Sequence, residues 1–487
     1  MLPLVFAATL IAPAVGAAAE PRRVATRGDG IIRSPINAIP GPAPKLRIRQ
    51  NEVQVENQRD GTRYGVEVEV GTPPQKVTLI LDTGSPDTWV NPSCETANVP
   101  ADCAAFPHFD YTQSSSLNET GVEDILVYGI GNATIQYVYE TVTIGSATIE
   151  NQIIGVATES HSIPLGILGV SPPVQGTNEY PYVLDTMAEQ GLINSRAFSL
   201  DLRGVDNPNG AIIFGGIDTG KYIGELAKLP MLSPEESPGG ADRYYVTMTG
   251  VGVTLPDGEV TQSEEINVAV FLDSGSTLSH LPTPIYQAFA EAFGDAQFDP
   301  TTGYYFVPCD VTELAGSVDF YFGSKAIRVP LNDFIWQVEG YCMLGILPND
   351  DEPILGDTFL RAAYVVFDQD NRNIHIAQAA NCDTNLVAIG SGADAVPSST
   401  GQCTELPTPT GSSGGRQTLD VTATRAPTNT FTGTAPTGVA IGPGPKVSGT
   451  ANVSPTATGN SAAGRGVEVG LGAVVLFGVV NVLASML

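Results

Sequence analysis

The stretch LILDTGSPDTWV (Leu79–Val90) carries an apolar run into an aspartate, which opens a Thr-Gly turn. Strand patterns lead up to it, because YGVEVEV (Tyr64–Val70) alternates with a period of two and KVTLIL (Lys76–Leu81) follows the turn-forming GTPPQ. We therefore expect Asp82 to stand at the end of a buried strand. Asp-Thr-Gly is also an ordinary turn composition, so one copy does not by itself indicate chemistry.

A second copy of the pattern occurs in VAVFLDSGSTLSHLP (Val268–Pro282), where the apolar run ends at Asp273 and Ser274-Gly275-Ser276 follow. Each Asp turn is followed, at a similar distance, by an apolar-apolar-Gly element, GILG at 166–169 and PILG at 353–356. A glycine there lets a strand pass close to the Asp turn, where a side chain would collide. The repeat predicts two homologous lobes in one chain.

Composition limits the classes of function. A chain of 487 residues with 42% hydrophobic content can form two compact lobes with extensions. The net charge of −29, from 23 Lys and Arg against 52 Asp and Glu, argues against nucleic-acid binding because a polyanion would be repelled. Six cysteines without Cys-x-x-Cys spacing favour disulfides made in an oxidising compartment over a zinc or thiol centre. We expect neither a metal nor a cofactor.

The N-terminus has the pattern of a secretory leader. Residues 1–19 are apolar and end in three alanines, which predicts a signal peptide, with an uncleaved membrane anchor as the alternative. Residues 20–49 are basic and Pro-rich, and we expect a propeptide held by charge against an acidic body, with a solvated linker as the alternative. The basic residues of this segment are Arg22, Arg23, Arg27, Arg33, Lys45, Arg47 and Arg49.

The C-terminal part of the chain changes composition twice. Residues 384–460 are rich in Ser, Thr, Pro and Gly, which predicts an unfolded, O-glycosylated stalk. Residues 461–487 end in LGAVVLFGVVNVLASML after small residues and a polar spacer, which is the layout of a removable GPI-attachment signal, with Asn460 or Ser461 as the attachment residue. A transmembrane helix, the alternative, is usually longer and carries basic residues on its cytoplasmic side. We expect the mature protein on the outer face of the plasma membrane, and transfer to the cell wall stays open.

Together these motifs resemble the pepsin-like aspartic proteases. The resemblance covers about residues 60–382 and rests on both Asp turns, Trp89, VYGIG near Tyr128, GILG, IIFGGIDTGKY (Ile212–Tyr222) and PILGDTFLRAAYVVFD (Pro353–Asp368). With its leader and tail, the chain looks most like the fungal GPI-anchored, yapsin-like branch. The resemblance implies an all-β, bilobal fold whose lobes, residues 50–230 and 231–383, are related by a pseudo-twofold axis and enclose an active-site cleft.

The resemblance also implies the chemistry of the two aspartates. Asp82 and Asp273 would share a proton and activate a water molecule that hydrolyses a polypeptide substrate at acidic pH. Which of the two holds the proton cannot be read from the sequence. The hydroxyls of residues 83 and 274 would cross-link the lobes, the two glycines would allow close approach, and the serines at 85 and 276 would donate to the outer carboxylate oxygens or serve as plain turn residues. These supporting residues are Thr83, Gly84, Ser85, Ser274, Gly275 and Ser276.

The resemblance places a flap over the cleft. Tyr128 and Gly129 match the flap, and the Tyr128 hydroxyl is expected to meet the indole nitrogen of Trp89, with core packing as the alternative role for both rings. Ile130 departs from the family pattern, in which Thr or Asp is usual, so a hydrogen bond to the substrate is expected to be lost. Asn132 heads an N-glycosylation sequon, and a glycan there would crowd the cleft. Further sequons begin at Asn118 and Asn452.

By analogy with the family we pair Cys94 with Cys103 and Cys309 with Cys342, which leaves Cys382 with Cys403. Spacing alone does not fix this connectivity. The acidic body and the yapsin-like branch suggest a preference for basic residues near the cleaved bond, read by Glu95, Asp102 or Asp110, and a broad preference for apolar residues is the alternative.

Two other functions remain to be weighed. A silent surface-binding protein could keep this fold without activity, although both Asp turns are intact. A dimeric protease of the retroviral type is excluded because both turns occur in one chain, and we expect a monomer.

Overall fold

The computed structural model describes residues 30–39, 46–49, 52–55, 63–91, 94–97, 100–129, 131–173, 180–205, 209–338, 340–404, 417–424, 426–433 and 436, with only the backbone at 46–49, 52–55, 101–102, 209 and 417. The predicted signal peptide, Ile130, Asn452, the two candidate GPI residues and the apolar tail lie outside these residues. Among the helices of the described segments, none has the length and apolar character needed to cross a membrane.

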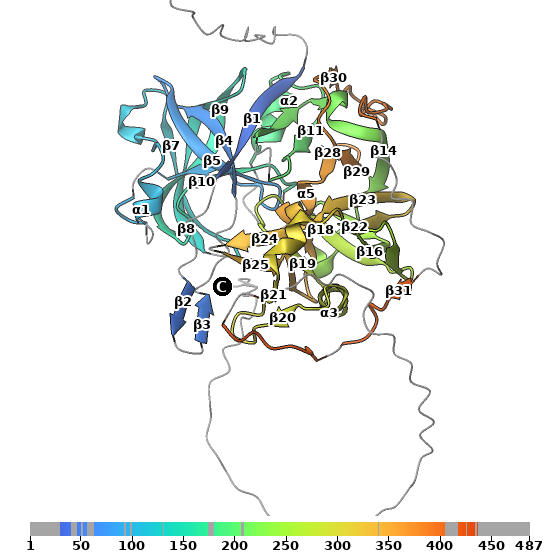
Figure 1. Cartoon of the computed structure of the whole chain (residues 1–487). Helices are drawn as coiled ribbons and strands as arrows, with labels where there is room; N and C mark the ends of the chain where they lie inside the picture. The colour runs from blue at the N-terminus through green and yellow to red at the C-terminus, as the bar shows by residue number, and fades with distance from the viewer. Residues whose placement is uncertain are drawn as a thin grey trace, which may run out of the picture. The chain divides into compact units, whose positions relative to one another are not determined.

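Strands dominate the described chain (Figure 1), which confirms the all-β prediction. The largest sheet has thirteen strands and draws on both halves of the sequence. In spatial order these strands are β14 (Tyr222–Pro230), β29 (Asn373–Ala379), β28 (Ala363–Asp368), β11 (Ala197–Asp201), β12 (Asn209–Phe214), β1 (Ile32–Ile39), β4 (Arg63–Val70), β5 (Gln75–Asp82), β10 (Gly166–Gly169), β6 (Trp89–Val90), β9 (Ala147–His161), β8 (Asn132–Ile144) and β7 (Asn118–Val127).

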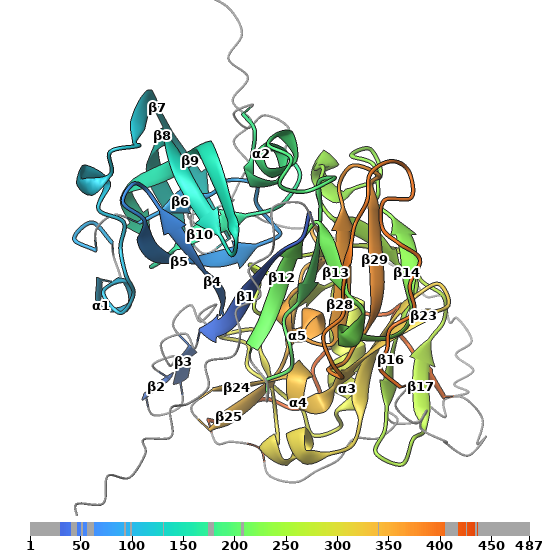
Figure 2. The same ribbon diagram turned by 90° about the horizontal axis from the view of Figure 1, so that it is seen from above.

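The second half of the chain adds three smaller sheets. One contains β15 (Tyr245–Met248), β18 (Val268–Leu272), β27 (Ile354–Leu355), β19 (Ser279–Leu281) and β26 (Ile346–Pro348). Another contains β23 (Lys325–Pro330), β22 (Ser317–Phe322), β16 (Gly250–Thr254), β17 (Val260–Ser263) and β31 (Gln417–Leu419). Figure 2 shows β16, β17 and β23 of this sheet on the side of the molecule away from β7, β8 and β9. The third contains β20 (Gln297–Phe298), β21 (Tyr305–Val307), β25 (Tyr341–Leu344) and β24 (Ile335–Val338).

Two strand pairs and several short helices complete the described elements. The pairs are β13 (Gly216–Asp218) with β30 (Leu386–Ala388) and β2 (Leu46–Arg49) with β3 (Glu52–Val55). The α-helices are α1 (Pro100–Cys103), α2 (Val183–Glu189), α3 (Thr283–Ala292), α4 (Leu331–Phe334) and α5 (Asp357–Leu360). The 3-10 helices are η1 (Tyr111–Gln113), η2 (Thr219–Lys221), η3 (Pro238–Gly240) and η4 (Cys309–Glu313).

The internal repeat is visible in how strands meet the two Asp turns. β10 runs parallel to β5 and places Gly169 opposite Asp82, and β27 runs parallel to β18. A Cβ on Gly169 would lie 2.5 Å from the Asp87 carbonyl oxygen, and one on Gly356 would lie 2.3 Å from the Ser276 carbonyl oxygen. Only glycine fits at either position, since heavy atoms do not approach so closely. In both halves of the repeat, a glycine therefore lets a parallel strand pack against the Asp turn.

Residues 32–39 of the predicted propeptide pair with the body as a strand of the largest sheet. These residues form β1, a central strand hydrogen-bonded between β12 and β4, and Ile32, Ile36 and Ile39 are buried. The basic residues and prolines of the segment suggested a charge-held surface extension. Burial of the regularly spaced isoleucines in the core, and not the charge of the segment, holds the strand in place.

The structure also corrects the predicted stalk over its described part. Leu419 and Val421 join the main hydrophobic core, and Phe431 stacks on Phe306 with ring centroids 3.9 Å apart. β30 and β31, at 386–388 and 417–419, pair with strands of the body. The expectation that residues 384–460 bury too little surface to pack is therefore wrong for these residues. Single apolar side chains in a polar segment can each be buried against the body, and the average composition of the segment does not reveal this.

Candidate active site

Asp82 and Asp273 face each other where the two Asp turns meet. Both side chains line the same cavity. A Cβ on Gly84 would lie 2.6 Å from Asp273 Oδ1, and a Cβ on Gly275 would lie 2.6 Å from Asp82 Oδ1. Each turn thus holds a glycine against the other turn's carboxylate, and the equality of the two distances reflects the pseudo-twofold relation of the lobes.

Thr83 and Ser274 join the turns beneath the carboxylates. The Thr83 hydroxyl donates to the Leu272 carbonyl, and the Ser274 hydroxyl donates to the Leu81 carbonyl, each at 2.9 Å. The amide of each residue donates to the hydroxyl of the other, at 3.1 Å from Thr83 and 2.9 Å from Ser274. All four groups are buried. The serine at 274 fulfils the role of a threonine because only the hydroxyl is used.

The outer hydrogen bonds of the two carboxylates are unequal. The Gly84 amide donates to Asp82 Oδ1 at 2.7 Å, and the Gly275 amide donates to Asp273 Oδ1 at 2.8 Å. The Ser85 hydroxyl adds a bond to Asp82 Oδ2 at 2.5 Å. Ser276 instead donates to the Leu278 carbonyl at 2.9 Å, so the expected bond from Ser276 to the carboxylate is wrong. Asp82 has one hydroxyl donor that Asp273 lacks.

This difference in hydrogen bonding affects the pKa values of the two carboxyl groups. Withdrawal from water raises the pKa of Asp82, and the hydrogen bonds from Ser85 and Gly84 oppose that rise. Withdrawal from water and the neighbouring charge of Asp82 raise the pKa of Asp273 well above its usual value. Donors favour the ionised form of the group that accepts them, so the geometry favours an ionised Asp82 beside a protonated Asp273.

Tyr128 covers this pair from the flap between β7 and β8. Its hydroxyl accepts a hydrogen bond from the Trp89 indole nitrogen at 2.8 Å, as the resemblance implied. The Tyr128 amide donates to the Gly131 carbonyl at 2.8 Å, which closes the turn of the flap. Burial raises the pKa of Tyr128 well above its ordinary value, so the hydroxyl stays protonated. Tyr128 is therefore fixed at the cleft as a neutral hydrogen-bonding group.

A cavity of about 310 Å³ opens around the dyad between the flap and the second lobe. Val127, Tyr128 and Gly129 line it from the flap side. The acidic and basic residues that line it besides the dyad are Arg63, Arg243, His280, Glu352 and Asp357. Sequence patterns did not indicate Arg63, Arg243 or Glu352, because they come from separate segments with no shared spacing, and His280 was passed over although it lies in the second Asp motif, Val268–Pro282. Asp357 lies in the PILGDTFLRAAYVVFD motif and could have been singled out there.

Arg243 and Glu352 form an ion pair in this cavity. Arg243 Nη1 lies 2.6 Å from Glu352 Oε1, and the Tyr245 hydroxyl donates to the same oxygen at 3.2 Å. The guanidinium carbon lies 5.2 Å from the centroid of the Phe271 ring, within cation-π range. The charge of Arg243 also lowers the pKa of both dyad aspartates, although burial outweighs it.

Asp357, which lines the cavity, and Arg361 are both buried. Burial raises the pKa of Asp357 well above its usual value, against the attraction of Arg361. Arg361 Nε donates to the Tyr64 hydroxyl at 3.0 Å, and Arg361 Nη1 donates to the Asp333 carbonyl at 3.0 Å. Because Tyr64 belongs to β4 and Arg361 follows α5, the first of these hydrogen bonds links the two halves of the chain next to the site.

The acids suggested for substrate recognition lie elsewhere. Glu95 is exposed in the loop after β6, and Asp110 caps η1 by accepting from the Thr112 amide at 3.0 Å. Neither lines the cavity, and the Asp102 side chain lies outside the described part of the chain. Of the sequon asparagines, Asn118 is exposed and Asn132 is half-buried.

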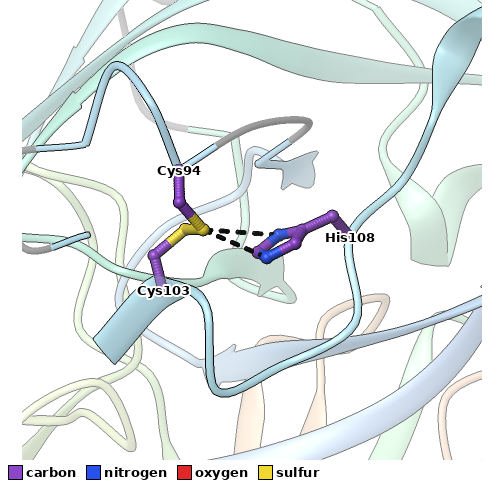
Figure 3. A group of neighbouring side chains, drawn as sticks. All are labelled: Cys94, Cys103 and His108. Carbon is purple, nitrogen blue, oxygen red and sulfur yellow. Dashed lines mark hydrogen bonds between the residues drawn. A yellow bond between two sulfur atoms is a disulfide. The ribbon is translucent and has the colours of Figure 1, made fainter. Parts of the chain in front are cut away.

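The structure contains the disulfides Cys94–Cys103, Cys309–Cys342 and Cys382–Cys403, which are the pairs proposed from the sequence. His108 lies beside the first, with Nε2 3.0 Å from Cys94 Sγ (Figure 3). The ligand atoms of Cys94, Cys103 and His108 lie within 4.8 Å of one another. Since the two sulfurs are bonded to each other, they provide no thiolate for a metal while the disulfide is intact.

Comparisons with known proteins show the family of the chain. The family model described as "Eukaryotic aspartyl protease" matches residues 63–379. A "Probable aspartic-type endopeptidase opsB" of Aspergillus oryzae is 33% identical over 75% of this chain and 79% of its own. "Aspartic proteinase yapsin-3" of Saccharomyces cerevisiae is 34% identical over 65% of this chain and 66% of its own. The "Aspartic proteinase MKC7" of the same yeast is 30% identical over 69% of each chain.

A solved structure supports the fold. The aspartic proteinase of Irpex lacteus has a TM-score of 0.55 to this chain, at 23% identity, and the match covers 72% of this chain and 97% of that one. At this identity the likeness bears on the fold alone. The family match and the relatives together establish that this chain belongs to the eukaryotic aspartyl proteases and is an aspartic-type endopeptidase.

Proposed function

We propose that the chain is a secreted, cell-surface endopeptidase that hydrolyses polypeptides at acidic pH through the Asp82–Asp273 pair. The observation that carries the proposal is the reciprocal geometry of the two Asp turns, in which each glycine abuts the other turn's carboxylate. Two carboxyl groups this close together cannot both ionise easily, so the pair retains one proton over a range of pH.

The inequality of the hydrogen bonds supports a division of roles. Ionised Asp82 takes a proton from a water molecule between the two carboxyl groups, and the water oxygen bonds to the carbonyl carbon of the substrate. Protonated Asp273 gives its proton to the carbonyl oxygen, which yields a neutral tetrahedral diol. The proton now on Asp82 passes to the leaving nitrogen, the C–N bond breaks, and a diol proton returns to Asp273.

Substrate preference is proposed to depend on Glu352. Its side chain is 41% exposed in the cavity, and the hydrogen bonds from Arg243 and Tyr245 both go to Oε1. Among the described residues no donor to Oε2 is found, so Oε2 is available to a basic side chain of a substrate. A preference for Lys or Arg near the cleaved bond would then come from Glu352 and not from Glu95 or Asp110.

The proposed location follows from the ends of the chain. The leader at 1–19 supports secretion, and the three disulfides suit an oxidising compartment. The tail at 461–487 supports a GPI anchor. Phosphatidylinositol-specific phospholipase should release the mature protein from membranes, and a mature chain that still contains Leu471 to Leu487 would exclude the anchor.

A peptide library tests the activity and its preference together. The secreted protein is incubated with the library at several pH values, with and without a pepstatin-type inhibitor. We expect inhibitor-sensitive cleavage that is strongest at acidic pH and enriched in Lys or Arg at the cut. Glu352→Gln should reduce that enrichment, and Asp110→Asn, a change outside the cavity, should leave it intact. Cleavage flanked only by apolar residues would refute the preference, and absence of inhibitor-sensitive cleavage would refute the activity.

A further inference from the structure

The hairpin of β7 and β8 exposes an unusual amount of apolar surface. The large apolar side chains that the described residues leave exposed are Tyr111, Val122, Ile125, Val127, Tyr139, Val205 and Leu386. Four of these, Val122, Ile125, Val127 and Tyr139, belong to this hairpin, and Val127 and Ile125 are 78% and 60% exposed. β7 is also the last strand of the thirteen-stranded sheet (Figure 2). Apolar side chains along an edge strand promote association with other strands unless something covers them.

The strand register places a sequon beside this surface at both ends of the hairpin. Asn132 is directly opposite Val127, and Asn118 is directly opposite Tyr139. Residues that face each other across antiparallel strands project to the same side of the sheet, with Cβ atoms about 4.5–5.5 Å apart. Ile125 is two residues from Val127 and therefore shares its face. Each sequon asparagine is thus the cross-strand neighbour of an exposed apolar side chain.

We propose that N-linked glycans on Asn132 and Asn118 cover the apolar side chains beside them, with the Asn132 glycan on Val127 and Ile125 and the Asn118 glycan on Tyr139. The C–H faces of sugar rings are apolar and can pack on aliphatic and aromatic side chains, while the hydroxyls stay in water. The inference rests on the proposed secretory route, since the chain must enter the compartment in which such glycans are added.

The modification needs only groups that the sequence and that compartment provide. The side-chain amide nitrogen of Asn bonds to the anomeric carbon of a lipid-diphosphate-linked oligosaccharide, the lipid diphosphate leaves, and the nitrogen loses a proton. Both sequons have the required hydroxyl, at Thr120 and Thr134. Transfer to the chain before it folds avoids any conflict with the pairing of Asn132 between β7 and β9.

The register also shows on which side of the flap the Asn132 glycan would lie. Ala133 is buried, and Leu126 and Tyr128 pack against the same cluster beneath the hairpin. Val127 and Asn132 alternate with these residues and so project to the opposite, outer face. Val127 also lines the cavity around the dyad. The glycan would therefore shield the outer face of the flap next to this cavity.

The test uses the full chain secreted from a glycosylating host. Mass spectrometry of its peptides should find glycans at both Asn118 and Asn132. Asn132→Gln, Asn118→Gln, or enzymatic removal of the glycans from the folded protein should each give a several-fold rise in the fluorescence of a dye that binds apolar surface, and more self-association in light scattering. Asn452→Gln, which removes a sequon far along the chain from the hairpin, is the control and should leave both signals unchanged.

Compensating changes show whether the named side chains are the covered ones. Val127→Thr with Ile125→Thr should cancel the rise caused by Asn132→Gln, and Tyr139→Thr should cancel that caused by Asn118→Gln. Secreted protein with both asparagines unmodified, or glycan removal without a change in dye binding, would overturn the inference. Peptidase assays on the same samples keep the two proposals apart: glycosylated protein without activity would contradict the proposed function alone, and an unglycosylated chain retained in the cell would contradict both.

Discussion

Thr83 and Ser274 exchange hydrogen bonds across the boundary between the two lobes, each amide donating to the hydroxyl of the other residue. Each hydroxyl in turn donates to the carbonyl of the residue that precedes the opposite aspartate, Leu272 or Leu81. The position of one carboxylate is therefore fixed by the backbone of the other lobe. The dyad cannot be assembled by either lobe alone.

Removing these buried hydroxyls should destabilise the protein as well as the site. Thr83→Val and Ser274→Ala each leave a buried carbonyl and a buried amide without a partner, at a cost of about 1–3 kcal/mol for each unsatisfied group. Because the two hydroxyls belong to one buried hydrogen-bond network, the loss of stability in the double variant should differ from the sum of the losses in the single variants. Urea unfolding of the four proteins measures this coupling. Strict additivity would contradict the reciprocal arrangement.

Ser85 and Ser276 should affect the pH dependence of activity differently. Ser85 donates to Asp82 and favours its ionised form, so Ser85→Ala should raise the pKa of Asp82 and move the acidic limb of the kcat/KM profile to higher pH. Ser276 donates to a backbone carbonyl, and Ser276→Ala is the matched control that should leave that limb in place. Equal shifts in the two variants would show that the asymmetry does not control the dyad.

Asp201 should make the fold less stable as pH rises. It pairs with Arg203 at 2.8 Å, but burial dominates and raises the pKa of Asp201 to about 6. A carboxyl whose pKa is raised on folding contributes its stability below the unfolded pKa of about 3.9 and loses it as pH rises through the folded value. The loss is on the order of 3 kcal/mol between about pH 4 and pH 6.

Asp201→Asn tests this dependence, because an amide does not ionise. Unfolding free energies measured from about pH 4 to pH 7 should decline less steeply in this variant than in the parent chain. Asp110→Asn, at an exposed cap, should keep the parental slope. A parental slope in the Asp201 variant would place the titration on another group.

Processing of the leader should spare β1. Removing residues 32–39 would leave β12 and β4 without the strand that pairs with both of them, and would expose the sites of three buried isoleucines. N-terminal sequencing of the active, secreted protein should therefore find a first residue before Ile32. An active protein that begins beyond Ile39 would contradict this and would restore the predicted boundary at residue 49.

The sequence indicated features that repeat or follow a period. The two apolar-Asp-Thr/Ser-Gly-Ser turns and the glycines that accompany them follow from patterns in the chain, and the Trp89–Tyr128 contact was implied by the family resemblance. Arg243 and Glu352 could not be found in this way, because residues about a hundred positions apart meet only after folding. The prediction for Ser276 was wrong because it was based on the likeness of its turn to that of Ser85. In the structure the Ser276 hydroxyl donates to the Leu278 carbonyl.

Sequence patterns also failed to predict which apolar residues are buried in segments of mixed composition. Ile36 lies in a basic stretch and Phe431 in a polar one, yet both are buried. The free energy of burying one large apolar side chain, about 1.5–3 kcal/mol, is enough to hold a segment that average composition describes as unpacked.

The central claim, that Asp82 and Asp273 together perform peptide hydrolysis, is tested most directly by Asp82→Asn and Asp273→Asn in the full secreted chain. Asparagine keeps the shape of the side chain and the hydrogen bonds from the Gly84 and Gly275 amides, but it can neither take up nor give up the proton. Thermal unfolding is compared with the parent to show that the fold is kept, and hydrolysis of a peptide substrate is measured at acidic pH. We expect each variant to unfold near the parental temperature and to lose peptidase turnover by several orders of magnitude; substantial turnover in either folded variant would contradict the account.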